Sequence, residues 1–190
     1  ILSILKLHSR VDATAEDRAR SAWKEYTTAI ASKRTHTVNI GILGKYTAIR
    51  DAYASIDKAI EHASTHLSAN VNIKWIDVTD LKTGTADPKL EAADLDGVIV
   101  PGGFGERGIE GKLAAVKWSR EHGIPFLGIC LGFQMAVIEF ARNVVGLEDA
   151  NSTEFDIKCK NPVIAELPEQ KEIEGLGGTM RLGGQDVAIT

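Results

Sequence analysis

A cysteine stands between two glycines in the stretch Pro125-Phe126-Leu127-Gly128-Ile129-Cys130-Leu131-Gly132-Phe133-Gln134. The apolar run 125–129 suits a strand at the centre of a sheet, and residues 133–145 have the pattern of a helix. This is the pattern of a nucleophile elbow, a strand-to-helix turn so sharp that side chains at the flanking positions would clash. It predicts Cys130 as a nucleophile whose thiolate is favoured by the helix N-terminus. The alternative is a buried cysteine acting as a small hydrophobic residue.

Outward from this turn, short apolar segments alternate with amphipathic ones along the chain. The predicted strands are 38–43, 71–76, 97–100 and 125–129, and the predicted helices are 52–67, with Asp51 as its N-cap, 109–121 and 133–145. This alternation is typical of an α/β fold with a mostly parallel central sheet and helices on both faces.

The remaining segments are more polar. Residues 1–36 are predicted to be an interdomain linker containing a helix over 13–31, whose apolar face carries Ala15, Ala19, Ala22, Trp23 and Tyr26. Residues 37–190 are predicted to form one domain. Within it, the polar stretch with Asp80, Gly84, Asp87 and Pro88 is predicted to be a loop, and loops with short strands near the sheet edge are expected beyond Gly146.

A glycine-rich segment, Gly102-Gly103-Phe104-Gly105-Glu106-Arg107-Gly108, follows the predicted strand 97–100. It lies at the carboxyl edge of the sheet, where open α/β folds bind ligands. Its G-x-G-x-x-G pattern is a weak match to a dinucleotide fingerprint, because the next strand ends at Cys130 without a carboxylate for a ribose. We interpret the segment as backbone amides that stabilise an oxyanion beside Cys130. A glycine-rich surface loop is the alternative.

Other short patterns do not predict sites. Gly44-Lys45 and Gly111-Lys112 lack the upstream glycine and the following Ser or Thr of a phosphate loop. His62 and His66 share one helix face without a third ligand, so no metal site is predicted. The two cysteines, in unlike contexts, argue against a disulfide framework.

The bulk composition is that of an ordinary globular protein. The formal net charge of −4 provides no broad positive field, so nucleic acids and anionic membranes are not expected as partners. The sequence also has no apolar run long enough to span a membrane or to form a signal peptide. We therefore expect a cytoplasmic protein that acts on small molecules.

Several segments together resemble the glutaminase domain of the CTP synthase family, a class I glutamine amidotransferase with flavodoxin-like layers. They cover about residues 38–183 and are more specific in combination than any one motif. The segments are Gly44-Lys45-Tyr46, Asp51-Ala52-Tyr53-Ala54-Ser55, Pro101 to Lys112, Gly128 to Gln134, Ile138 to Val144, Asn151-Ser152-Thr153-Glu154-Phe155-Asp156 and Gly177-Gly178-Thr179-Met180-Arg181-Leu182-Gly183.

The resemblance implies that Cys130 attacks the side-chain amide of L-glutamine, releases ammonia and forms a thioester that water hydrolyses to glutamate. It implies an oxyanion hole made by the amides of Gly103 and Leu131. The implied glutamine-binding residues are Gly102, Gly103, Phe104, Gln134 and Glu154, the last facing the substrate ammonium.

The resemblance also implies partners outside this domain. Ammonia would pass to a synthetase domain of the same protein, where UTP is aminated to CTP with ATP and Mg²⁺, and no cofactor is expected in the glutaminase domain itself. GTP is the family's activator, with Arg107 as the candidate effector residue. The full enzymes of the family are homotetramers.

Two departures from the family matter. Phe133 stands where the family usually has Met. The family's catalytic His and Glu lie in a C-terminal His-x-Glu segment that these 190 residues do not contain, so we expect a domain truncated at its C-terminus that hydrolyses glutamine negligibly by itself.

Three other functions remain open on the sequence alone. Another class I amidotransferase would share the glycine-rich segment and the cysteine elbow. A non-catalytic nucleotide-binding module would use the 103–108 loop without chemistry. An assembly role would use residues 1–36 as a tether between domains.

Overall fold

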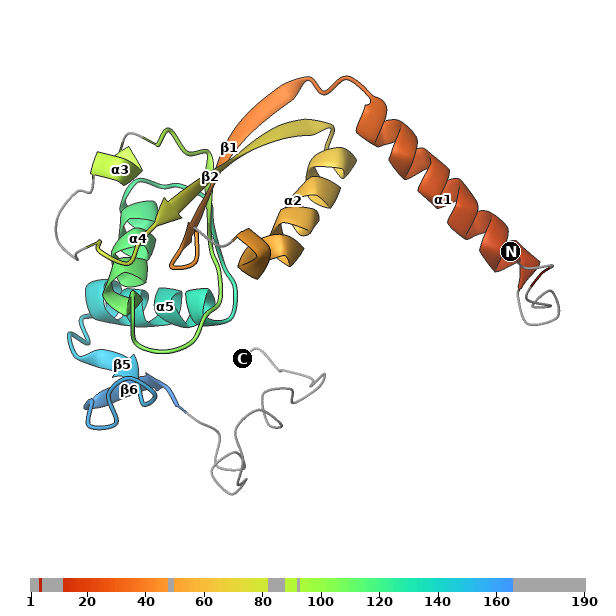
Figure 1. The fold of residues 1–190 in the computed structure, drawn as a ribbon. Coiled ribbons are helices and arrows are strands. Elements are labelled where there is room, and N and C mark those ends of the chain that lie inside the picture. Colours follow the sequence, from red (N-terminus) through yellow and green to blue (C-terminus); the bar gives the residue numbers. More distant parts are fainter. Residues whose placement is uncertain (1–3, 5–11, 48–49, 82–87, 92, 166–190) are drawn as a thin grey trace.

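A parallel four-stranded sheet forms the centre of the computed structural model, which describes residues 4, 12–47, 50–81, 88–91 and 93–165 (Figure 1). Its strand order is β2-β1-β3-β4. The strands are β1 (His36–Gly44), β2 (Ala69–Asp77), β3 (Gly97–Val100) and β4 (Phe126–Gly128). The order confirms the predicted α/β class and its parallel sheet.

The connections that follow β1 and β2 place the next strands on opposite sides of β1. The chain moves from β1 outward to β2, and then to β3 on the other side, so β1 and β3 flank the point where the order reverses. Ligands of open α/β sheets bind outside the carboxyl ends of the strands at this point. The prediction that 125–129 lies at the sheet centre is wrong for the described part of the chain, because β4 pairs with β3 alone and is the outermost strand.

Two helices cover one face of the sheet and close the main core. They are α4 (Ile109–Glu121), as predicted, and α5 (Leu131–Phe140), which continues as the π-helical turn η3 (Ala141–Val145). Buried side chains from these helices meet the strands, including Leu43, Val98 and Val100 from the sheet with Leu113, Val116, Met135 and Ile138 from the helices. Burial of these apolar groups is the main stabilising contribution to this layer.

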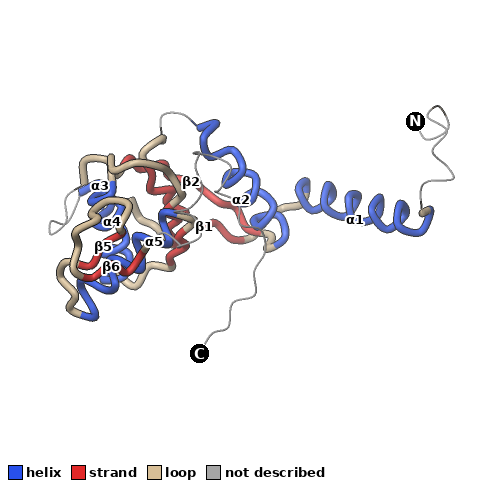
Figure 2. The backbone as a smooth tube through the Cα atoms, turned by 90° about the horizontal axis from the view of Figure 1, so that it is seen from below, coloured by secondary structure: helices blue, strands red, loops and turns tan. Residues whose placement is uncertain are grey.

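The opposite face is covered less completely, by α2 (Ala54–His66) (Figure 2). An apolar groove of about 400 Å³ remains between α2 and the sheet, with Val38, Ile60, Leu67 and Leu127 among its lining residues. The prediction that Asp51 caps this helix is wrong. Asp51 lies in a preceding 3-10 turn, η2 (Arg50–Tyr53), and the N-cap position is held by Tyr53 without a side-chain hydrogen bond.

The N-terminal helix α1 (Ala13–Ala31) projects away from the sheet (Figure 1). Asp12 caps it by accepting hydrogen bonds from the N–H groups of Thr14 and Ala15, at 2.9 and 3.1 Å. The helix has no buried residue, and Trp23 is 66% exposed. The helix contacts α2, and one of these contacts is an edge-to-face arrangement of the Tyr26 and His62 rings with a centroid distance of 5.4 Å.

The segment after α5 forms a second, smaller sheet. Its two parallel strands are β5 (Ala150–Ser152) and β6 (Asn161–Ile164), which pack against α5 and agree with the short strands expected beyond Gly146. The polar stretch 80–88 is only partly described, and Pro88 begins a short helix, α3 (Pro88–Glu91), instead of ending a loop. The predicted signature Gly177 to Gly183 lies outside the described residues.

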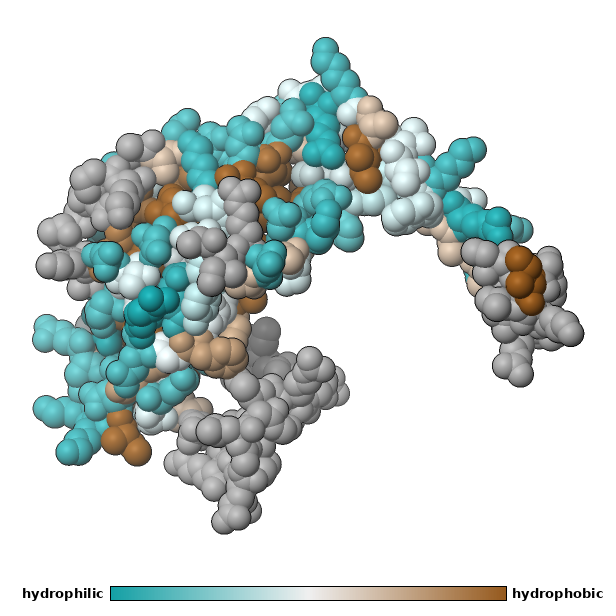
Figure 3. Space-filling model, in the orientation of Figure 1, coloured by the Kyte–Doolittle hydropathy of each residue, from teal (hydrophilic) through white to brown (hydrophobic). Residues whose placement is uncertain are grey.

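On the face shown in Figure 3, hydrophilic side chains cover most of the described surface, and apolar side chains form separate patches. Among the described residues, no helix has the length and apolar character needed to cross a membrane.

Candidate active site

Cys130 occupies the turn between β4 and α5. It is the N-cap residue of α5, and its thiol is free and exposed. Its backbone has φ 54° and ψ −113°, a combination that residues other than glycine rarely adopt. This conformation, predicted from the sequence as a nucleophile elbow, holds the side chain at the carboxyl edge of the sheet, and the alternative of a buried cysteine is wrong.

The two flanking glycines are required by close backbone contacts. A methyl group added at Gly132 would lie 1.9 Å from the carbonyl oxygen of Val100, and one added at Gly128 would lie 2.6 Å from the backbone nitrogen of Phe133. Both distances are far below van der Waals contact, and the neighbouring atoms are backbone and cannot move aside. The steric reason given for the Gly-x-Cys-x-Gly spacing is therefore confirmed.

The glycine-rich loop after β3 lies directly beside the cysteine. A methyl group at Gly102 would be 3.2 Å from Cβ and 3.6 Å from Sγ of Cys130. The loop continues through Gly105 and Gly108, with φ values of 74° and 82° that favour glycine, and Gly108 is the N-cap residue of α4. The two motifs that the sequence placed at one edge of the sheet thus come into contact.

Two buried lysines lie beneath this loop. Lys112 of α4 is fully buried, and its Nζ donates to the carbonyl oxygens of Pro101 at 2.7 Å and Gly102 at 3.3 Å. Lys45, directly after β1, is 5% exposed, and its Nζ donates to the carbonyl oxygens of Phe104 and Gly105. The loop carbonyls on both sides of Gly103 are therefore bound to ammonium groups.

The charge state of Lys112 reflects this environment. Its pKa is lowered to about 8, chiefly because burial penalises the charged form and also because Lys45 is positive. The negative charge of a Cys130 thiolate acts in the opposite direction and raises the pKa of Lys112. The charges of Lys45 and of a Cys130 thiolate thus act on Lys112 in opposite directions.

The other predicted site residues are placed as follows. Leu131 and Gln134 belong to the first turns of α5, and the N–H of Gln134 donates to the carbonyl oxygen of Cys130 at 3.1 Å. Phe104, at 65% exposure, and Arg107 project from the loop into solvent. No described residue accepts a hydrogen bond from the N–H of Gly103 or Leu131, the two predicted oxyanion donors.

Glu154 is less closely tied to the cysteine. It lies in the turn after β5, where its N–H donates to Oγ of Ser152 at 3.2 Å, and its side chain is exposed. The small sheet packs on α5, the helix that begins at Cys130. Within the described part of the chain, no hydrogen bond joins Glu154 to the glycine-rich loop.

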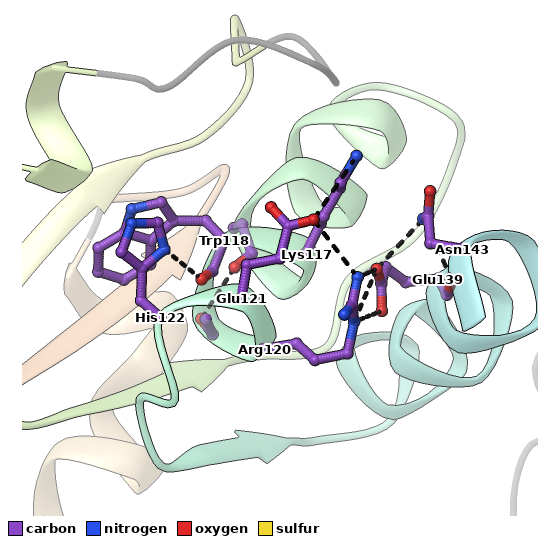
Figure 4. A network of polar contacts seen from close by, with 9 residues as sticks. Lys117, Trp118, Arg120, Glu121, His122, Glu139 and Asn143 are labelled. Atoms are coloured by element: carbon purple, nitrogen blue, oxygen red, sulfur yellow. Dashed lines mark hydrogen bonds and ion pairs between the residues drawn. The ribbon is translucent and has the colours of Figure 1, made fainter.

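A polar clamp fastens the other end of α5 to α4 (Figure 4). Arg120 forms a two-pronged ion pair with Glu139, with Nη2 to Oε1 at 2.8 Å and Nε to Oε2 at 3.0 Å. Asn143 donates to the same carboxylate at 3.1 Å, and Glu139 is 2% exposed. The clamp fixes the helix whose first residues form the elbow.

The sequence predicted no role for the two lysines. Gly44-Lys45 and Gly111-Lys112 do not match a phosphate loop, and the resemblance of the segments that contain them implied no function for either lysine. One feature of the sequence could have indicated that Lys112 is buried. Lys112 falls on the apolar stripe of its helix, with Ile109, Leu113 and Val116 at spacings of three and four residues, where a charged side chain is unusual. No equivalent signal marks Lys45.

The arrangement suits attack of a thiol on a carbonyl carbon. The thiol is exposed, backbone N–H groups without acceptors in the described part of the chain lie next to it, and ammonium groups bind the carbonyl oxygens of the loop. Among the described residues, no cluster of three or more His, Cys, Asp or Glu side chains could hold a metal ion.

Comparisons with known proteins agree with this geometry. Residues 48–189 match the family model for class-I glutamine amidotransferases. The chain is 46% identical over 180 residues to the CTP synthase of Methanopyrus kandleri, covering 95% of this chain and 34% of that protein. It is 56% identical over 147 residues to the CTP synthase of Deinococcus radiodurans, covering 77% and 27%.

A solved structure gives the same result. The glutaminase domain of Trypanosoma brucei CTPS, with bound acivicin, aligns with a TM-score of 0.62 and 42% identity over 67% of this chain and 49% of that one. The chain spans about a third of the length of the curated relatives it matches, 34% for the Methanopyrus protein.

Proposed function

Because the chain belongs to the class I glutamine amidotransferase family, we propose that it is the glutaminase domain of a CTP synthase and that Cys130 is the nucleophile in the whole protein's hydrolysis of L-glutamine. The observation that carries the proposal is the exposed Cys130 thiol on a strained elbow with the Gly102 backbone against it. The relatives named above are CTP synthases, and the aligned solved domain binds acivicin, a chloro-isoxazoline amino acid that reacts as a glutamine-like electrophile.

In the proposed reaction, Sγ of Cys130 attacks the side-chain amide carbon of glutamine. The developing oxyanion is stabilised by the N–H groups of Gly103 and Leu131. Collapse of the tetrahedral intermediate breaks the C–N bond, and the nitrogen leaves as ammonia with the proton that the thiol gave up. Water then cleaves the thioester, which yields glutamate and restores the thiol.

The remaining contacts are assigned to substrate binding. Gly102, Phe104 and Gln134 are proposed to contact the glutamine, and Glu154 is proposed to bind its ammonium group by charge-assisted hydrogen bonding. The packing of the small sheet on α5 supports this assignment of Glu154. Arg107, exposed on the same loop, is proposed as the effector residue.

In the whole protein, we propose that ammonia passes to a synthetase domain, where UTP is aminated to CTP with ATP and Mg²⁺ under activation by GTP, within a cytoplasmic homotetramer. The lack of buried residues in α1 supports the assignment of 1–36 as an interdomain linker and 37–190 as the glutaminase domain. The wider activity rests on the CTP synthase relatives, each much longer than this chain.

The test is covalent labelling by acivicin, followed by intact mass and peptide mapping. We expect one adduct, on Cys130, that forms more slowly in excess glutamine, and none in Cys130→Ser. Cys159, a half-buried thiol elsewhere on the chain, is the internal control. Equal labelling of both cysteines, or no protection by glutamine, would contradict the proposal, and tight binding of NAD or another nucleotide by Cys130→Ala would favour a binding module instead.

A further inference from the structure

We propose that Lys45 and Lys112 are positioning residues for the oxyanion hole, because together they hold the glycine-rich loop in the orientation that presents the N–H of Gly103 to the substrate. This inference rests on the proposed glutaminase function. Neither lysine touches the substrate in this scheme, and both act through the loop backbone.

The two lysines grip the loop on either side of Gly103. Lys112 donates to the carbonyl oxygens of Pro101 and Gly102, which both precede Gly103 in the chain. The Gly102 carbonyl belongs to the peptide bond that joins Gly102 to Gly103. Lys45 donates to those of Phe104 and Gly105, which follow it. The lysines come from different elements, the end of β1 and the first turn of α4, so the grip ties the loop to two independent parts of the fold.

The direction of the carbonyls determines the direction of the amides. In a planar trans peptide, the C=O of one residue and the N–H of the next point to opposite sides. Because the carbonyl of Gly102 is directed at Lys112, the N–H of Gly103 points away from Lys112. That N–H has no acceptor among the described residues, so it is available for a substrate oxygen.

A glycine-rich loop needs hydrogen bonds of this kind to keep one backbone conformation. Gly102, Gly103 and Gly105 carry no side chain that could fix the backbone by packing, and glycine has the largest conformational freedom of any residue. Lys45 also limits what residue 103 can be, because a methyl group there would lie 3.2 Å from Cε of Lys45. The same methyl group would lie 3.6 Å from Nζ of Lys112, so both lysine side chains lie against Gly103.

The burial of Lys112 is costly, and this cost argues against a purely structural role. Burying an ammonium group costs more free energy than burying an apolar side chain of the same size. Buried ionisable groups with strongly shifted pKa values are concentrated at functional sites. Lys112 is fully buried between the core stripe of α4 and the loop. A methionine would fill the same volume without the charge.

The experiment compares two reagents on the full 190-residue chain. The diazo-ketone analogue of glutamine presents a ketone oxygen to the oxyanion hole. Its diazo carbon takes up the proton of the thiol, Sγ then attacks this carbon, and the new C–S bond forms as the C–N bond breaks and dinitrogen leaves. Iodoacetamide reacts with the same thiol and needs no oxyanion hole. The measured quantity is the ratio of the two labelling rates at Cys130, by intact mass.

For Lys45→Met and Lys112→Met we expect the ratio to fall about ten-fold or more, as expected for loss of an aligned oxyanion donor, with the iodoacetamide rate within about two-fold of wild type. Lys117→Met, a change of the same type on the outer face of α4, should leave the ratio unchanged. Lys45→Gln and Lys112→Gln keep a donor and should recover part of the ratio, and they serve if a methionine variant does not fold.

The outcomes separate the two claims. Wild-type chain that is not labelled by the diazo-ketone overturns both the glutaminase function and the role of the lysines. Normal wild-type labelling with an unchanged ratio in the lysine variants overturns the role of the lysines alone. An equal fall with both reagents also overturns it, because a general loss of structure would slow every reaction of the thiol.

Discussion

The cysteine elbow and the glycine-rich loop meet at the same site, but their backbones are held by different forces. The elbow depends on steric exclusion, since the backbone atoms around Gly128 and Gly132 lie so close that no side chain fits at either position. The loop is held by attraction, through ammonium groups that bind its carbonyl oxygens. Steric restraint is local and specific to glycine, whereas the electrostatic restraint depends on two lysines that are distant in sequence.

The steric side of this contrast predicts the largest effect. Gly132→Ala would place a methyl group 1.9 Å from the carbonyl oxygen of Val100, so α5 or β3 must shift. We expect the free energy of unfolding to fall by more than about 3 kcal/mol, at or above the upper range for overpacking, and acivicin labelling to be lost. Urea denaturation and labelling measure the two quantities.

The control for this change is Gly97→Ala in β3. Its added methyl group would meet Cδ1 of Ile40 at 3.0 Å, the flexible end of a side chain, so a loss of only about 1 kcal/mol is expected. Equal costs at the two glycines would show that the elbow has no special steric requirement.

The clamp at the far end of α5 predicts an intermediate effect. Arg120→Ala leaves the buried carboxylate of Glu139 with only Asn143 as a side-chain donor among the described residues. We expect a loss of about 2 to 3 kcal/mol in the free energy of unfolding, below the range for a fully buried pair because Arg120 is partly exposed. Labelling of the folded protein should be unchanged, since Glu139 lies at the opposite end of the helix from Cys130.

Glu121→Ala provides the matched comparison, because it removes the other carboxylate near Arg120, at 3.7 Å and exposed. A change of less than about 0.5 kcal/mol is expected for a surface pair. If Glu121→Ala proved as costly as Arg120→Ala, burial of Glu139 would not be the source of the stability.

The electrostatic side predicts the smallest effect, with a definite dependence on pH. The pKa of Lys112 is lowered to about 8 in the folded chain, from 10.5 for a free lysine. Between these values the unfolded state binds the proton and the folded state does not, so the stability of the wild type rises with pH in this window. Below pH 8 the full penalty for the buried charge remains.

Lys112→Met removes the titrating group. Its stability relative to wild type should therefore be greatest at pH 7 and should decline by about 2 kcal/mol between pH 7 and 10. Paired urea denaturation curves at several pH values measure this difference, with Lys117→Met as the control. A difference that is constant with pH would mean that Lys112 is not charged and buried as described.

The elements that the sequence predicted well are those with a strong local pattern. The helix over 109–121 has its apolar stripe, Gly97–Val100 is a compact apolar strand, and Cys130 lies between two glycines. In the described part of the chain the run 125–129 lies at the sheet edge, with Leu127 54% and Ile129 37% exposed. Its apolar character did not predict this position, because hydrophobicity marks residues that suit burial and does not show which elements cover them. Asp51 was assigned as a cap by residue type alone, and η2 displaced the helix start.

The elbow of Cys130 and the class of the fold were determined by short segments of sequence, because backbone sterics and hydrophobic periodicity act over a few residues. The environment of Cys130 was decided only by the tertiary structure. Lys45 and Lys112 are 67 positions apart by their numbering and are brought under one loop by the parallel arrangement of β1 and β3. Interactions between charges depend on distance in space, which residue spacing along the chain does not encode.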